Sequence, residues 1–188
     1  TSHWRQAAAI EGYLALAAIK QTQGDITAAD DAIQTARVLA RQFDITVLDD
    51  MIVDMVEARL HLQRGEIEPV TRWARLRGLD INWPLITDLP PGLLSMQRYD
   101  VLVLAHLLLR LNRPADTLTV LDKLDEKDKT RIHITVEVEI ELLRALAYDR
   151  LSQDDAALAA LERALNLASE SDIIRSFLEF GPPVAHLL

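Results

Sequence analysis

The 188-residue sequence contains no cysteine and only six glycines, and aromatic residues make up just 5% of it. The absence of cysteine excludes disulfides and thiolate metal sites, and it is typical of the reducing cytoplasm, where we expect this protein. The sequence also lacks a secretory signal and any apolar run of about eighteen residues, so we expect no membrane association. Its first residue is Thr1 rather than methionine, which suggests a fragment of a longer polypeptide.

Basic residues are also sparse, with 20 Lys and Arg against 29 Asp and Glu, which gives a net charge of −9. This balance argues against nucleic-acid binding by this segment itself. The sequence has no Gly-x4-Gly-Lys phosphate loop, no Gly-x-Gly-x-x-Gly motif and no His-x-x-x-His pair. We therefore predict a protein that is not an enzyme and has no metal or cofactor in this segment. Its acidic clusters are expected near helix starts or on a solvated face: Asp49-Asp50, Asp154-Asp155 and Glu137/Glu139/Glu141.

Small residues, by contrast, recur at fixed spacing around four polar breaks. The breaks are Gly24, Gly65, Asn112 and Ser152, about forty residues apart, and such a period is typical of stacked helix pairs. A small residue before each break and a small or short one after it allow two helices to approach closely. Glycine and asparagine also tolerate the left-handed backbone that ends a helix. Ser152 suits that role less well, and with Asp155 it is an alternative cap for the following helix.

The spacing predicts an all-α fold, a right-handed superhelix of four antiparallel helix pairs closed by a short C-terminal capping helix. All 188 residues are expected to form one domain. The predicted pairs span residues 3–43, 45–78, 92–127 and 130–170, with an ordered loop over 79–91 and a cap over 172–188.

Three stretches need individual interpretation. In the first helix, Trp4, Ala8, Tyr13, Leu16, Ala17 and Ile19 are expected near the apolar stripe. The proline-rich loop 79–91 is too apolar for a free linker, because it contains Trp83, Leu85 and Ile86, so we expect it to pack on the stack and to contribute to a binding surface. Residues 132–141 alternate like a strand, but Val136, Ile140, Leu143 and Ala147 form a helical stripe, and we predict a helix there.

Polar residues of the first helix in each pair are the candidate binding residues, because these helices line the concave side of such stacks. Arginine side chains can hold a carboxylate or phosphate or donate to hydroxyls, and a tyrosine can stack on a ring. The alternative is that these side chains only solvate the surface or satisfy backbone carbonyls. The candidate residues are Gln21, Arg59, Gln63, Tyr99, His106, Arg110 and Arg150.

Several stretches, in this order, carry a family resemblance. They are ARLHLQRGE (58–66), RWA (72–74), NRPADTL (112–118), AALAALERAL (156–165) and IRSFLEFGPPVAHLL (174–188). The repeat skeleton resembles tetratricopeptide repeats, although most of their large aromatics are missing. Together the stretches resemble the superhelical sensor region of the large MalT-like, LuxR-type transcriptional regulators, over nearly the whole chain.

This resemblance implies a sensor that receives a small-molecule inducer or a protein partner and supports self-association. It places ATP binding in an upstream ATPase module and DNA binding in a C-terminal helix-turn-helix domain, both outside this segment. It does not identify the inducer. A free-standing tetratricopeptide scaffold that binds peptides or partner proteins remains the alternative.

Overall fold

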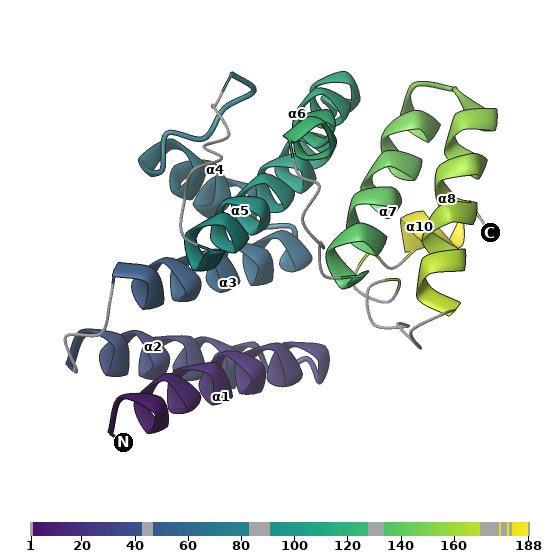
Figure 1. Cartoon of the computed structure of the whole chain (residues 1–188). Coiled ribbons are helices and arrows are strands. Elements are labelled where there is room, and N and C mark those ends of the chain that lie inside the picture. The colour runs from purple at the N-terminus through teal and green to yellow at the C-terminus, as the bar shows by residue number, and fades with distance from the viewer. Residues whose placement is uncertain are drawn as a thin grey trace.

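Every regular element described in the computed structural model is an α-helix, which confirms the predicted all-α helical-repeat fold (Figure 1). The structure describes residues 2–42, 47–82, 91–127, 134–169, 177, 180 and 182–187. In chain order the helices are α1 (Ser2–Thr22), α2 (Ile26–Gln42), α3 (Val47–Arg64), α4 (Ile67–Leu76), α5 (Pro91–Arg110), α6 (Pro114–Lys127), α7 (Ile134–Arg150), α8 (Asp154–Ser169) and α10 (Pro182–Ala185).

The four breaks share one backbone conformation. Gly24, Gly65, Asn112 and Ser152 all have positive φ, between 56° and 79°. At each break the amide of that residue bonds to the carbonyl three residues earlier, and the next amide bonds to the carbonyl five residues earlier. This is the Schellman motif, which satisfies the last carbonyls of the preceding helix. Ser152 therefore takes the role of its glycine and asparagine counterparts, and α8 begins two residues after it.

The small residues lie where paired helices touch. Ala17, Ala29, Ala105, Thr117 and Ala145 are all fully buried. Thr117 illustrates the contact, because its hydroxyl donates a hydrogen bond to the Ala105 carbonyl of the partner helix, 3.4 Å away. A side chain larger than alanine at position 105 would separate the two helices.

The helix pairs stack in sequence from α1–α2 to α7–α8 (Figure 1). The first helices of successive pairs contact one another, α1 with α3, α3 with α5 and α5 with α7. We call the surface that α3, α5 and α7 form together, on the side of Arg59 and His106, the A-helix face. It is the face on which the sequence places the candidate binding residues.

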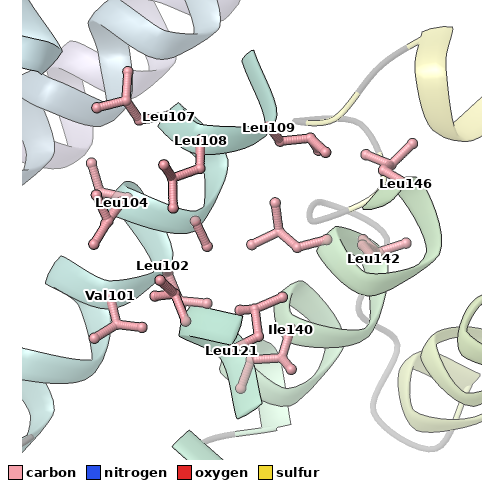
Figure 2. Close-up of a cluster of buried hydrophobic side chains, with 14 of the residues drawn as sticks. Val101, Leu102, Leu104, Leu107, Leu108, Leu109, Leu121, Ile140, Leu142 and Leu146 are labelled. Atoms are coloured by element: carbon pink, nitrogen blue, oxygen red, sulfur yellow. The ribbon is translucent and has the colours of Figure 1, made fainter. Parts of the chain in front are cut away.

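The larger core cluster runs from α3 to the C-terminal segment, and a smaller one joins α1, α2 and α3. In the larger cluster, residues 101–109 are buried except for His106. Figure 2 shows leucines of α5 in this cluster, together with Leu121 of α6 beside Ile140 of α7. The predicted stripe of α7 is also buried, which confirms helix rather than strand for residues 134–141.

The Trp4 side chain lies outside the described part of the structure, and the rest of the predicted stripe of the first helix is wrong except for Ala17. The structure buries Ile10, Leu14 and Ala17, whereas Tyr13, Leu16 and Ile19 are 36%, 39% and 53% exposed. Helix α1 is apolar over much of its circumference, so its sequence pattern does not single out one face. The side that packs is set by α2 and α3, the two helices that contact α1.

The C-terminal segment packs on α7, where Phe180 and Val184 are buried in the larger core cluster. Residues 172–176 of the predicted cap lie outside the described residues, as do Trp83, Leu85 and Ile86 of the predicted loop. None of the helices in the described part of the chain combines the length and apolarity needed to cross a membrane.

Candidate functional site

A cluster of polar side chains gathers on the A-helix face where α3, α5 and α7 meet. Its centre is His106, and the helical spacing of Val103, His106 and Arg110 places these three residues on one side of α5. Val103 and His106 border a small cavity of about 10 Å³, on the scale of one water molecule. The residues that line it are Arg59, Leu62, Gln63, Val103, His106, Glu139 and Phe180.

Arg59 and Glu139 form the ion pair of this cluster. The Nη1 atom of Arg59 lies 3.0 Å from a carboxylate oxygen of Glu139, and a second hydrogen bond from Nη2 measures 3.1 Å. Such two-point contact fixes the guanidinium plane as well as its position. The sequence predicted a solvated face for Glu139 and Glu141, and this is wrong. Both are buried, and Glu141 pairs with Arg144 and Arg163 at 2.9 and 2.8 Å.

His106 is neutral in the folded protein. Burial lowers the pKa of its imidazole to about 3, and the nearby guanidinium groups of Arg110, Arg59 and Arg150 lower it in the same direction. Its ring stacks on Phe180 with 5.0 Å between centroids and 24° between planes. The sequence did not identify Phe180, because this residue follows the repeats and obeys none of their spacing.

Arg110 and Arg150 complete the basic part of the cluster. The guanidinium of Arg150 donates to the backbone carbonyl of Leu109, which holds its side chain against the end of α5. Arg110 is exposed and forms no ion pair with another described residue. The cluster thus contains an arginine available for an incoming ligand, beside two arginines that the fold already positions.

Two predicted glutamines act as a connection between α1 and α3. The amide nitrogen of Gln21 donates to the Leu60 carbonyl at 3.1 Å and to Gln63 Oε1 at 2.7 Å. Gln21 Oε1 in turn accepts from Arg64 Nε at 2.6 Å. Both glutamines therefore have structural partners, and Gln63 also borders the cavity.

Tyr99 lies apart from the other predicted residues. It is two turns before His106 on α5, partly buried against the larger core cluster, and it does not line the cavity. The structure thus gathers Arg59, Gln63, His106, Arg110 and Arg150, with Gln21 joined through Gln63. Their binding of any ligand stays a prediction.

The electrostatics of the cluster favour an anion. Three guanidinium groups surround a neutral imidazole, and Glu139 is the acidic residue that lines the cavity. In a chain with a net charge of −9, this local excess of positive charge can attract a carboxylate or phosphate. Within the described residues, no group of three or more His, Asp or Glu side chains is arranged to hold a metal ion.

A family model described as the MalT-like TPR region matches residues 1–188. No curated protein and no solved structure matches the chain.

Proposed function

The chain belongs to the family of MalT-like tetratricopeptide regions, and we propose that it is the signal-sensing part of a LuxR-type transcriptional regulator. In this proposal the A-helix face binds an inducer or a partner protein in the cytoplasm, and binding is coupled to self-association and to transcription. The observation that carries the proposal is the family match over residues 1–188. ATP and DNA binding belong to other parts of the regulator, upstream and downstream of this segment.

Arg110 is the first contact residue in this proposal, with Arg150 and Arg59 beside it. Its exposure and lack of an ion pair within the described chain support this role, since no internal contact has to be broken before it binds. An acidic or hydroxyl-rich group of the inducer or partner would contact the guanidinium of Arg110, with those of Arg150 and Arg59 nearby. Charge-assisted hydrogen bonds of this kind are stronger than neutral ones and give orientation as well as affinity.

The size of the cavity supports a protein or peptide partner over an enclosed small molecule at this face. A space of about 10 Å³ holds a water molecule, whereas small-molecule pockets measure about 300–1,000 Å³. The same observation favours a second candidate function, a free-standing scaffold that binds an acidic peptide across α3, α5 and α7.

Reading the gene on both sides of this segment tests the regulator proposal directly. We expect an ATPase module with a phosphate loop upstream and a helix-turn-helix domain of about sixty to seventy residues downstream, a size near the lower end for domains. A stop codon directly after Leu188, with no ATPase upstream, would overturn the proposal and leave the scaffold function.

A further inference from the structure

A second hollow lies on the opposite side of α5 from His106. It is about 440 Å³ in volume and is bordered by the C-terminal half of α4, residues 78–82 and the end of α5. We call it the α4–α5 groove. Its volume falls in the range of small-molecule sites, about 300–1,000 Å³.

The sequence builds this groove through the periodicity of α5. Leu104, Leu107, Leu108 and Leu111 follow the spacing i, i+3, i+4 and i+7, and so form one stripe toward α4. Figure 2 shows Leu104 and Leu107 on the side of α5 away from Leu142 of α7. Leu104, Leu107 and Leu108 form an apolar floor and are 4%, 3% and 3% exposed. Leu111, which is 43% exposed, forms part of the rim and presents most of the apolar surface of the four leucines.

The opposite wall depends on the way α4 ends. Gly78 has φ of +65°, its amide bonds to the Arg75 carbonyl, and the Leu79 amide bonds to the Ala74 carbonyl at 2.9 Å. This is a further Schellman motif, in which the residue after the glycine turns back toward the last turn of the helix. Leu79 and Ala74 are both buried and line the groove.

The polar residues of the rim differ in how far they are already engaged. The Thr71 hydroxyl donates to the Ile67 carbonyl, Arg113 pairs with Asp116 at 2.6 Å, and Asp80 accepts from the Asn82 amide. Arg75 is exposed and has no ion pair with another described residue. The exposed Asp80 keeps its negative charge in this contact, so the rim carries both signs. Arg75 is the rim cation that has no ion pair among the described residues, next to the apolar floor.

We propose that the α4–α5 groove binds an amphipathic anion, an alkyl or aryl chain that ends in a carboxylate. The chain lies on the leucines of α5, where burial of each methylene is favourable, and the carboxylate accepts hydrogen bonds from Arg75. The site is separate from the A-helix face, because the two are lined by opposite sides of α5. The proposal does not depend on the regulator function.

Octanoate titrated into the 188-residue chain, followed by isothermal titration calorimetry and amide NMR shifts, tests this proposal. We expect saturable binding with shifts in residues 74–82 and 104–113. Arg75→Glu should weaken octanoate binding at least tenfold, because it places a like charge beside the carboxylate. Arg72→Glu should change it less than twofold, since Arg72 is exposed on the same helix but does not line the groove.

A second titration uses octyltrimethylammonium, a ligand of equal chain length and opposite charge, to test whether the groove prefers an anion. We expect it to bind at least tenfold more weakly than octanoate. Equal binding of the two ligands, unchanged binding to the Arg75→Glu variant, or no saturable octanoate binding would each overturn the proposal. Arg110→Glu should leave octanoate binding unchanged, and a loss there would instead place the carboxylate on the A-helix face.

Discussion

Arg59 of α3 forms an ion pair with Glu139 of α7, a residue 80 positions later in the chain, at 3.0 Å. The pair links the second and fourth helix pairs of the stack beside α5. The Glu139 side chain is only 10% exposed, so Arg59, rather than water, supplies the hydrogen bonds and the opposite charge that stabilise its carboxylate.

Replacing Arg59 with methionine should lower the free energy of unfolding by about 1–3 kcal/mol, since a desolvated carboxylate loses its partner. Urea denaturation at pH 7 measures this change. The double variant Arg59→Met with Glu139→Gln is the control, and it should recover part of the loss because no charge is left unpaired. A double variant as unstable as the sum of both single ones would argue against the pair as a coupled unit.

His106 should make stability depend on pH. The pKa of His106 is about 3 when folded against an ordinary value of 6.5, so between these values the unfolded chain binds a proton that the folded chain does not. Stability from this group should therefore be full above pH 6.5 and fall on acidification, by up to about 1.4 kcal/mol per pH unit. The charged groups facing the ring are Arg59, Arg110, Arg150 and Glu139.

The variant His106→Phe preserves a ring against Phe180 and cannot take up the proton. Its loss of stability between pH 7 and pH 5, followed by urea denaturation, should be smaller than that of the unmodified chain. Equal losses in the two proteins would mean that His106 is protonated normally in the folded state.

Arg77 and Asp100 form a buried pair at 2.7 Å, between the end of α4 and α5. Burial raises the pKa of Asp100, and the hydrogen bond and charge of Arg77 oppose that rise. Arg77→Met should therefore raise the pKa of Asp100 further and destabilise the protein at pH 7 by about 1–3 kcal/mol. The loss should be smaller at pH 5, where the isolated carboxyl can protonate.

Asp100→Asn supplies the background in which that pH effect should vanish, because no carboxylate is left. If Arg77→Met costs the same at pH 5 and pH 7 even with Asp100 present, the contribution of Arg77 comes from its packing on Trp73, 5.5 Å away, rather than from its charge.

Ser152 and Gly65 occupy equivalent breaks with φ of 56° and 78°. Ser152→Gly should stabilise the protein by about 0.5–1 kcal/mol, since glycine adopts this conformation without a Cβ penalty. Gly65→Ala should destabilise it by a similar amount, although no heavy atom lies within 4 Å of the added carbon. Thermal unfolding compares the two variants, and opposite shifts are expected. A destabilised Ser152→Gly variant would show that the serine side chain contributes more than the backbone strain costs.

The helix pairs could be predicted from the sequence because their determinants are local. A left-handed residue ends each first helix, and small residues on both sides of it allow close packing. The burial of Glu139 could not be predicted, since its partner lies 80 residues away and the local pattern resembles an exposed acidic face. The packed side of α1 was likewise decided by α2 and α3 rather than by its own periodicity.

The candidate site was predictable only in part, for a related reason. His106 and Arg110 share one side of α5 through helical spacing, whereas Arg59 and Arg150 reach them through the stacking of α3 and α7. Phe180 joins them from outside the repeats. The α4–α5 groove depends on the turn at Gly78, and that glycine predicts where α4 ends but not the depth of the hollow beside it.

The most direct test of the sensing role is the transcriptional response of the intact regulator that contains this segment. Arg110→Glu reverses the available charge on the A-helix face, and Arg41→Glu makes the same change at an exposed position of α2. We expect Arg110→Glu to abolish the response to the signal or to shift its half-maximal concentration at least tenfold, about 1.4 kcal/mol, while Arg41→Glu responds normally. A normal response from Arg110→Glu would contradict the assignment of the A-helix face as the sensing surface.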